Sequence, residues 1–582
     1  MRRGDRAGTQ ARRSGPTAHH THRPGRTHAP VMPSACDVRQ CTTSRADSPA
    51  AKGGWPPLGG CPPLPGSTTS VPSRVRGSPG EGDFNMGGLR GKTLRIVALT
   101  SLGMLALACG SGTVGAPDAP PTQDGPVLVP PTRAQLRLVQ AAPGAPAVDV
   151  YIAGDPTPVA NAVAYGATTP YLTRDAGPIT VELRPTGAAP ESRPLLSLGV
   201  GMEGGTRWTV VAAGGSPPAP TDAALRLLLL RDNPVPADGG QARLRVVNAG
   251  TDAPTVDVDL GNDGSVEVAS LARFSDSGET ALVVPSGSAL QVGLRGGGAA
   301  PVMTSFTLPA LGSGTDTLIV ATGLLSQPAR AGDGFSLLTA GRDGTLAILR
   351  QNPTLYVLNA SPDAPPLDLF AGDHPFFRDL TSGALSSPLQ VAPGTYVLDL
   401  FAATPAEARP AAPPVASITT PTLVPGERYL MVAAGYLTPP GPSAHPFTLL
   451  SLTERFADDP ANLRLRWVHA ASDTPAMDVG PLGSGRRVLP DAPFLNVPFA
   501  AATAPDGLPL PSGGAITLGV VPTNEANRAP RTTFSLTPVA DTRLFAVATD
   551  APGAEPGSWD LQLLLVDTSR TPWTVSAQAH EP

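Results

Sequence analysis

One short pattern occurs four times in this chain of 582 residues, and it limits what the chain can fold into. Each occurrence closes with an aspartate between two apolar residues; the four segments are Leu136–Val150, Leu244–Val258, Leu355–Leu369 and Leu465–Val479. Their closing aspartates are 108, 111 and 110 residues apart. This regular spacing indicates four copies of one domain of about 110 residues, a size that suits a single hydrophobic core.

Within each copy the apolar residues alternate with a period of two, which predicts β-strands. In copy two, Leu244–Val247 and Val256–Leu260 are such runs, and Gly261–Gly264 supplies a turn after the second. The chain also contains 64 glycines and 70 prolines, a load that argues against long helices. With about seven strands in each copy, the sequence predicts an all-β chain of four tandem immunoglobulin-like β-sandwich domains.

The repeated pattern resembles the domain-of-unknown-function family 4397, which occurs in bacterial exported and cell-surface proteins. The pattern is most nearly complete at Val247–Val258, and copy three, with Asn359–Pro365, is the most similar to the family. Copy one departs from it, because Gly144 stands where the other copies carry aspartate. The resemblance covers residues 134–570 and implies an exported or surface location, but it supplies no activity.

A lipoprotein signal peptide is predicted at residues 86–108. Basic residues precede the 13-residue apolar run Ile96–Ala108, which is too short for the roughly 20 residues that span a bilayer. The junction Leu105–Cys109 resembles the lipobox of bacterial lipoproteins, and this implies cleavage before Cys109 and attachment of lipid to its sulfur. We therefore expect contact with a membrane through the lipid on Cys109. Ser111 favours the outer membrane over the inner one, by analogy with enteric bacteria.

Residues 1–85 differ from the rest of the chain in charge. They carry twelve basic and five acidic residues, a net charge of +7, whereas residues 109–582 carry 27 arginines and 42 acids, a net charge of −15. A signal peptide beginning at Met86 would be internal if they were present, so we interpret them as a disordered, mis-annotated N-terminal extension. The alternative is a basic arm for nucleic acid, but its arginines lie among prolines without interleaved aromatic residues. No nucleic-acid partner is expected.

The expected organisation follows from these boundaries. The N-terminal part consists of the extension (1–85), the signal peptide (86–108) and the lipidated cysteine with its Pro/Gly-rich tether (109–133). The four β-sandwich repeats are residues 134–240, 241–352, 353–461 and 462–582.

Two sets of aspartates recur and are candidate site residues. One set lies in a strand: Asp149, Asp257, Asp368 and Asp478. The other lies in the preceding loop, five residues earlier: Asp252, Asp363 and Asp473. Together they suggest either a calcium site or a structural role in holding the loop to the sheet. Calcium takes six or more oxygen ligands and the motif supplies two carboxylates, so we favour the structural role and expect no metal or other cofactor.

Catalytic signals are weak in this sequence. After Cys109 there is no cysteine or lysine, which excludes thiol and Schiff-base catalysis there. The four remaining histidines do not recur between copies, and no nucleophile elbow or metalloprotease motif is present. His469 holds the position of Gln140, Asn248 and Asn359, which predicts a polar strand residue. We expect a protein without enzyme activity.

The strongest non-repeated ligand candidate is the segment His374, Phe376, Phe377 and Arg378 in copy three, just after a predicted turn. Adjacent phenylalanines near a loop can bind a sugar ring or a partner protein. In the alternative, which we favour, one phenylalanine belongs to the core and the other covers a sheet edge.

These features predict a lipid-anchored cell-envelope protein that acts as a binding, adhesion or spacer module, with a surface protein or a polysaccharide as partner. The alternative is an envelope polysaccharide-binding component or hydrolase with a site between domains. Clustering of Trp208, Trp467, Trp559 or Trp573 on an exposed face would favour sugar binding. Burial of these tryptophans at equivalent core positions would favour the role of a spacer.

Overall fold

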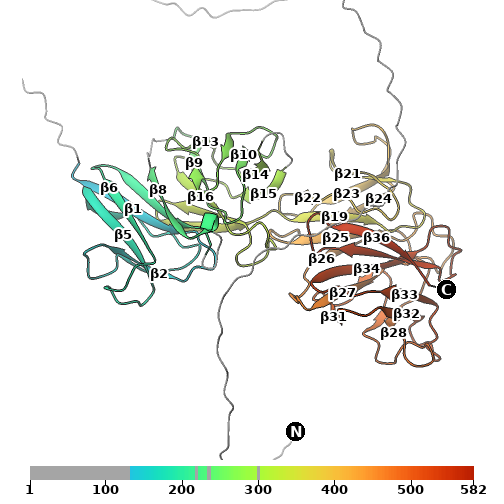
Figure 1. Ribbon diagram of the computed structural model, residues 1–582. Helices are drawn as coiled ribbons and strands as arrows, with labels where there is room; N and C mark the ends of the chain where they lie inside the picture. Colours follow the sequence, from blue (N-terminus) through green and yellow to red (C-terminus); the bar gives the residue numbers. More distant parts are fainter. Residues whose placement is uncertain (1–130, 216–220, 233–236, 298–301, 582) are drawn as a thin grey trace, which may run out of the picture. The chain divides into compact units, whose positions relative to one another are not determined.

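The computed structural model describes residues 131–215, 221–232, 237–297 and 302–581 (Figure 1). The predicted extension, the signal peptide, Cys109 and the tether up to residue 130 lie outside this part of the chain. In the described residues the regular structure is almost entirely β-strand, with one short 3-10 helix, η1 (Thr221–Ala223). The described part contains no helix with the length and apolar character that crossing a bilayer would need.

The strands fall into four groups that match the four copies of the motif. Repeat 1 contains β1 (Arg133–Gln140), β2 (Val148–Ile152), β3 (Ala160–Val163), β4 (Leu172–Asp175), β5 (Gly177–Pro185), β6 (Leu196–Met202), β7 (Arg207–Ala213) and β8 (Arg226–Asp232). Repeat 2 contains β9 (Gln241–Asn248), β10 (Val256–Leu260), β11 (Val268–Leu271), β12 (Ser275–Asp276), β13 (Leu282–Pro285), β14 (Leu290–Gly296), β15 (Val302–Leu308), β16 (Asp316–Thr322), β17 (Ser336–Gly341) and β18 (Gly344–Arg350).

The second half of the described chain repeats this order. Repeat 3 contains β19 (Thr354–Asn359), β20 (Leu367–Ala371), β21 (His374–Leu380), β22 (Leu389–Gln390), β23 (Val397–Ala402), β24 (Ala416–Thr419), β25 (Arg428–Ala434) and β26 (Thr448–Thr453). Repeat 4 contains β27 (Asn462–His469), β28 (Met477–Pro481), β29 (Phe494–Val497), β30 (Ala501–Ala502), β31 (Leu508–Pro511), β32 (Ile516–Pro522), β33 (Thr532–Leu536), β34 (Thr542–Asp550), β35 (Leu561–Asp567) and β36 (Thr574–Ala579).

Each repeat is built from two sheets. In repeat 1 the strand orders are β4-β1-β7-β8 and β3-β2-β5-β6, and repeat 3 has the corresponding orders β22-β19-β25-β26 and β21-β20-β23-β24. In repeats 2 and 4, two short strands replace the β4-type strand, and β18 or β36 extends the opposite edge. The predicted all-β fold of tandem sandwich-like units is therefore confirmed.

The first strand of each repeat runs parallel to a strand far away in the sequence. β1 pairs with β7 from Gln135 opposite Arg207 to Gln140 opposite Ala212, and β9·β16, β19·β25 and β27·β34 pair in the same way. The remaining strand pairs within the sheets are antiparallel, as expected for a sandwich. With the β4-type strand included, repeats 1 and 3 contain eight described strands each, compared with the expected seven.

The apolar residues between the two sheets form a core in each repeat. In repeat 1 this core includes Leu136, Val150, Val181 and Val210, all of which are buried. Repeats 2, 3 and 4 each have their own cluster of the same kind. Alternate residues of each strand enter the core, and this accounts for the period of two in the sequence.

Two further apolar clusters join the repeats in pairs. One contains Val139 and Val211 of repeat 1 together with Val247 and Val320 of repeat 2. The other joins repeats 3 and 4, where β25 lies beside β34 and β36 (Figure 1). The sheet that contains the first strand of each repeat is thus covered on both faces, and this explains continuous apolar runs such as Val210–Ala213.

Candidate functional site

The four strand aspartates make the same contact in every repeat. Each carboxylate accepts a hydrogen bond from a backbone N–H on the neighbouring strand, at a point where the pairing register shifts. The bonds are Ala162 N to Asp149 (2.8 Å), Ser270 N to Asp257 (2.6 Å), Asp379 N to Asp368 (2.9 Å) and Asn496 N to Asp478 (2.8 Å). All four donor residues have φ between 49° and 55°. The motif aspartate therefore holds a β-bulge whose backbone is otherwise unfavourable for a residue with a side chain.

Asp149, Asp368 and Asp478 also hold the loop that follows β5, β23 or β32. Asp149 accepts from the backbone N–H of Gly187 (2.9 Å), and Asp368 accepts from Thr404 N (3.1 Å). Asp478 instead accepts from the Thr523 hydroxyl (2.9 Å) and from Arg528 (2.8 Å). These carboxylates are buried, and their oxygens accept hydrogen bonds from neighbouring segments of the same repeat.

These contacts change the acidity of two of the aspartates. Burial raises the pKa of Asp149, but the backbone N–H groups of Ala162 and Gly187 stabilise the carboxylate more strongly, and the net pKa lies below its ordinary value. For Asp478, burial again raises the pKa, and the bonds from Asn496 N and Arg528 lower it further than burial raises it. Both groups are therefore carboxylates at neutral pH.

The loop aspartates hold a different part of the repeat. Asp252 accepts from the N–H groups of Leu325 and Ser326, at 2.6 and 2.9 Å. Asp363 does the same with Leu437 and Thr438, at 2.8 and 2.9 Å, and Asp473 accepts from Gly557 N at 2.5 Å. The strand and loop aspartates thus bind separate segments. Among the described residues, no group of three or more His, Cys, Asp or Glu is placed to hold a metal ion.

His469 lies in the strand position that the sequence predicts. It is fully buried, its Nε2 lies 3.1 Å from the carbonyl oxygen of Pro475, and burial lowers its pKa to about 4. Asn248, at the same position in repeat 2, donates to the carbonyl oxygen of Pro254 at 2.9 Å. Both side chains fasten the strand to the loop that contains the repeated proline.

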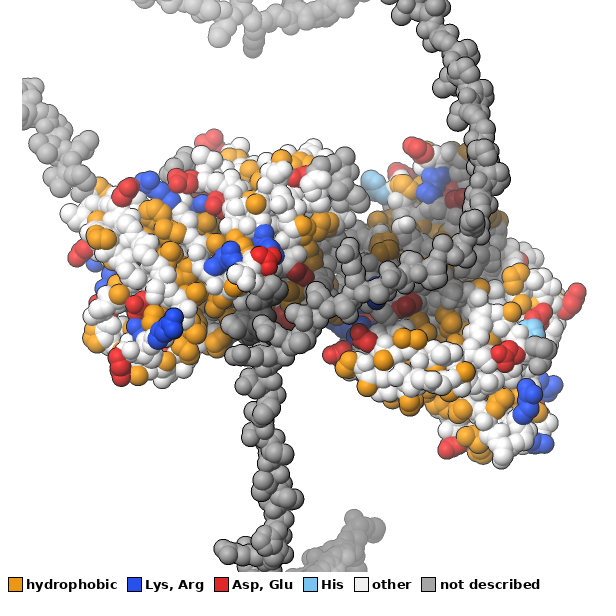
Figure 2. Space-filling model, viewed as in Figure 1, with side chains coloured by type: hydrophobic (Ala, Val, Ile, Leu, Met, Phe, Trp, Pro, Cys, Tyr) orange, Lys and Arg blue, Asp and Glu red, His pale blue; other side chains and the backbone are white. Residues whose placement is uncertain are grey.

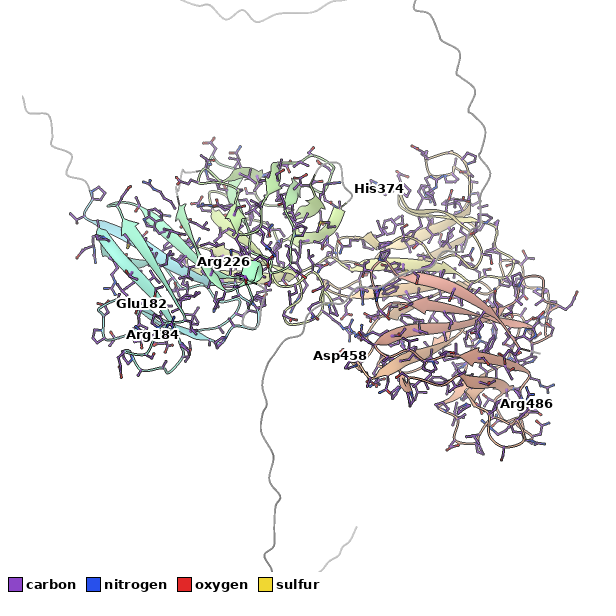
Figure 3. The ribbon with its side chains drawn as sticks, in the orientation of Figure 1. Glu182, Arg184, Arg226, His374, Asp458 and Arg486 are labelled. Atoms are coloured by element: carbon purple, nitrogen blue, oxygen red, sulfur yellow. The ribbon has the colours of Figure 1, made fainter. Side chains whose placement is uncertain are left out.

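The candidate segment at residues 374–378 forms the first part of β21. Phe377 is buried in the core of repeat 3, and Arg378 forms an ion pair with Asp368 (3.1 Å) while donating to the carbonyl oxygens of Thr404, Ala406 and Glu407. His374 is exposed at the start of the strand (Figure 3), and Phe376 is half-buried. The segment therefore divides into two side chains engaged by the fold and two that face a cleft.

This cleft of about 710 Å³ lies where repeat 2 meets repeat 3. Its lining residues come from both repeats and from the segment that joins them: Gly261, Asn262, Gln291, Asn352, Ala371, Gly372, His374, Phe376, Gln390, Val391, Ala392, Thr395, Tyr396 and Val397. The sequence prediction found His374 and Phe376 but not the amides or Tyr396. Those residues are scattered over more than 130 positions and share no motif, so only the folded chain brings them together.

The four tryptophans considered as a sugar-binding surface are separated in the structure. Trp467 is fully buried in the core of repeat 4, and Trp573 is buried in the cluster between repeats 3 and 4. Trp208 and Trp559 are half-buried against the cores of repeats 1 and 4. They therefore do not form one exposed aromatic face.

Comparison with known families gives a match for two segments of the chain. A family model described as "Domain of unknown function (DUF4397)" matches residues 134–259 and 353–480. The chain contains DUF4397 domains. The predicted resemblance is thus confirmed for these two segments, and each begins with repeat 1 or repeat 3 and ends in the second strand of the following repeat.

Other comparisons add little to this assignment. No curated protein matches the chain. One similar solved structure is "The Bacillus anthracis TIE protein", at 8% identity and a TM-score of 0.10. The match covers 52% of this chain and 50% of that one, so the chain spans about half the length of the protein it matches.

Proposed function

We propose that this DUF4397 protein is a lipid-anchored component of the bacterial cell envelope that binds or spaces other envelope components and carries out no catalysis. The signal-peptide pattern before Cys109 and the tether after it support export and lipid attachment, with the outer membrane favoured by Ser111. A tether of about 24 Pro- and Gly-rich residues would reach roughly 25–30 Å from the membrane.

The observation that supports the spacing role best is that the repeats are joined in pairs by buried apolar contacts. Repeats 1 and 2 share one buried apolar cluster, and repeats 3 and 4 share another. A spacer must resist bending at its junctions, and buried apolar surface between domains provides that resistance.

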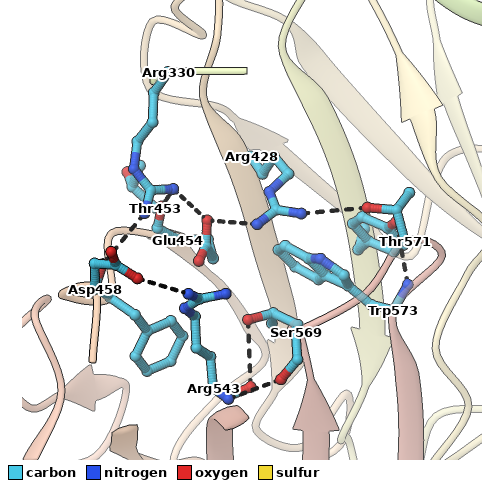
Figure 4. Close-up of polar contacts among 12 residues, drawn as sticks. Arg330, Arg428, Thr453, Glu454, Asp458, Arg543, Ser569, Thr571 and Trp573 are labelled. Carbon is cyan, nitrogen blue, oxygen red and sulfur yellow. Dashed lines mark hydrogen bonds and ion pairs between the residues drawn. The ribbon is translucent and has the colours of Figure 1, made fainter. Parts of the chain in front are cut away.

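Repeat 2 is also held to repeat 3 by a buried carboxylate. Glu454, which is fully buried, accepts from Arg330 of repeat 2 at 2.6 Å and from Arg428 of β25 at 2.9 Å (Figure 4). Arg330 also donates to the backbone oxygens of Glu454 and Phe456. The two arginines are needed here because the Glu454 carboxylate alone would be a buried, unpaired charge.

A binding role is favoured by a second observation, the cleft between repeats 2 and 3. Glycoside hydrolysis uses a pair of carboxylic acids on either side of the scissile bond, and the lining of this cleft contains no Asp or Glu. The cleft therefore supports saccharide binding better than saccharide hydrolysis.

The experiment that tests this proposal is intact-mass spectrometry of the native protein, extracted in detergent from its own cells. The expected mass is that of residues 109–582 plus a lipid modification. A Cys109→Ser variant serves as the control, and we expect it to leave the membrane fraction. A lipid-free mass that includes residues 1–85 would contradict the proposal.

A further inference from the structure

We propose that the cleft between repeats 2 and 3 binds a neutral saccharide. This inference rests on the proposed envelope-binding function and names the ligand class of its site. A cleft of about 710 Å³ is within the roughly 300–1,000 Å³ range of small-molecule sites, and it has room for a short segment of an oligosaccharide chain.

The side chains around the cleft favour an uncharged ligand. None of the residues that line it is Asp, Glu, Arg or Lys. On the face that Figure 2 shows, Arg side chains lie interspersed with Asp and Glu side chains. The net charge of −15 over residues 109–582 would repel polyanions. An anionic polymer is therefore disfavoured by the cleft, which has no Arg or Lys, and by the negative net charge of residues 109–582.

Two aromatic side chains provide apolar surface in the cleft. Phe376 and Tyr396 lie with their ring centroids 5.4 Å apart and their planes tilted by 59°. Both are half-buried, and the Tyr396 hydroxyl donates to the carbonyl oxygen of Ala392 at 2.6 Å, which fixes the ring. A fixed aromatic surface next to polar groups suits a sugar ring, which has an apolar face of C–H groups and a polar rim of hydroxyls.

The polar groups come from a network of amides that joins the two repeats. Asn352 is 2% exposed, and its Nδ2 donates to Gln291 Oε1 and to the Ser305 hydroxyl, both at 3.0 Å. Gln390 Oε1 accepts from Ser305 N at 2.6 Å. The floor of the cleft is therefore already ordered before a ligand arrives, which reduces the entropic cost of binding.

This network leaves hydrogen-bond donors for a ligand. An amide NH₂ group has two hydrogens. Gln291 Nε2 donates to Thr307 Oγ1 at 3.0 Å, and Gln390 Nε2 has a single long contact, 3.4 Å, to Thr354 Oγ1. Each amide thus keeps at least one hydrogen for a hydroxyl acceptor. Together with the exposed imidazole of His374, they form a polar set that can recognise hydroxyls without a charge.

Titration of the full chain from Cys109 with neutral hexasaccharides tests the inference. The probes are cellohexaose, maltohexaose, laminarihexaose and chitohexaose, with oligogalacturonate as an anionic counterpart, and binding is measured by isothermal titration calorimetry. We expect at least one neutral probe to bind and the anionic probe not to bind. Binding of oligogalacturonate in preference to all neutral probes, or binding of none, would overturn the inference.

Substitutions locate the binding within the chain. Phe376→Ala removes half of the aromatic surface, and we expect the affinity to fall at least about tenfold. Val397 lines the cleft and is 55% exposed, so Val397→Glu leaves the core intact but places a charge that the ligand must desolvate. Val415 is 47% exposed in the same repeat and lies outside the cleft, so Val415→Glu is its matched control. Equal affinities for the two glutamate variants would overturn the inference.

A proline-rich segment is the competing occupant, because aromatic-lined grooves also bind extended proline-rich chains. A synthetic peptide of residues 110–133 is therefore titrated in parallel. If this peptide binds and Val397→Glu weakens it while no saccharide binds, the saccharide inference is overturned.

The result is distinguishable from failure of the proposed function. A chain that carries lipid on Cys109 but binds no neutral probe overturns the cleft inference and leaves the spacer role. A chain that binds a probe through the cleft but carries no lipid overturns the envelope location and leaves the saccharide site.

Discussion

Arg137 in repeat 1 donates a 2.6 Å hydrogen bond to the carbonyl oxygen of Gly341 in repeat 2. The reciprocal contact is also present. Arg245 in repeat 2 is the equivalent of Arg137, and it donates to the carbonyl oxygen of Arg231 in repeat 1, also at 2.6 Å. The strand registers place Arg231 and Gly341 at equivalent positions. Reciprocal contacts between equivalent positions are typical of a twofold interface, so repeats 1 and 2 form a pair.

Repeats 3 and 4 use the same scheme with one replacement. Arg466 of repeat 4 donates to the carbonyl oxygen of Thr453 in repeat 3 at 2.8 Å. In repeat 3, Tyr356 stands at the position equivalent to Arg137. Its ring stacks on that of Trp573, with the ring centroids 4.1 Å apart and the planes at 8°. The two reciprocal interfaces therefore group the four repeats into two pairs.

Replacing Arg245 with alanine should loosen the first pair. Arg245 is 7% exposed and also binds Asp276 at 2.7 Å, so its removal takes a charged donor from that carboxylate and from the carbonyl oxygen of Arg231. We expect a loss of about 3 kcal/mol in the free energy of unfolding, together with faster amide hydrogen exchange in β8 and β17. Urea denaturation and hydrogen–deuterium exchange measure both. Arg193→Ala, at an exposed position, is the control, and an equal effect there would contradict the prediction.

Replacing Glu454 with glutamine should release repeat 2 from repeat 3. The neutral amide at this fully buried position removes the counter-charge of the partly buried Arg330 and Arg428, and we expect a cost of about 3 kcal/mol. Protection of the segment 324–335 against hydrogen exchange should fall, because Arg330 belongs to it. Glu407→Gln, at an exposed position, should leave exchange unchanged. Unchanged protection in the Glu454 variant would refute the role of this ion pair.

The all-β fold could be predicted because its signals are local. The period of two in Leu244–Val247 and the turn residues after Val256–Leu260 depend on neighbouring positions only. The recurring aspartate could also be assigned to a strand, since it lies between two apolar residues. These features require no knowledge of what packs against them.

The pairing of repeats and the cleft could not be predicted, because they depend on contacts between distant segments. The partners of the motif aspartates are Ala162, Ser270, Asp379 and Asn496, which share no residue type; only their backbone N–H groups are used. A signal for pairing does exist in the continuous apolar runs such as Val210–Ala213, which show that both faces of a sheet are covered. The runs do not show which repeat covers the second face.

Replacing Asp368 with asparagine should destabilise repeat 3. Asp368 is 1% exposed and accepts from Asp379 N and Thr404 N while pairing with Arg378. Asparagine turns one acceptor into a donor that faces these donors, so we expect a loss of about 2–3 kcal/mol. Asp373→Asn changes an exposed aspartate in the same repeat and should cost less than about 0.5 kcal/mol. Chemical denaturation of both variants tests this, and equal losses would show that the bulge contact is dispensable.

Asp550 should make the stability of repeat 4 depend on pH. Repeats 1–3 have a glycine at this position, with φ near +90°, whereas the Asp550 side chain is 5% exposed and accepts from Ser472 N at 2.8 Å. Burial raises the pKa of Asp550 from 3.8 to about 7, and the nearby carboxylate of Asp473 raises it as well.

The sign of the effect follows from this raised pKa. Between pH about 4 and about 7 the unfolded chain has lost the Asp550 proton while the folded chain keeps it, so the free energy of unfolding falls as pH rises through this window. Above it the contribution is constant. Asp550→Asn cannot ionise and should remove this part of the pH dependence, which urea denaturation at pH 5 and pH 8 measures. If the variant and the natural chain lose equal stability between these two pH values, Asp550 does not ionise as the fold predicts.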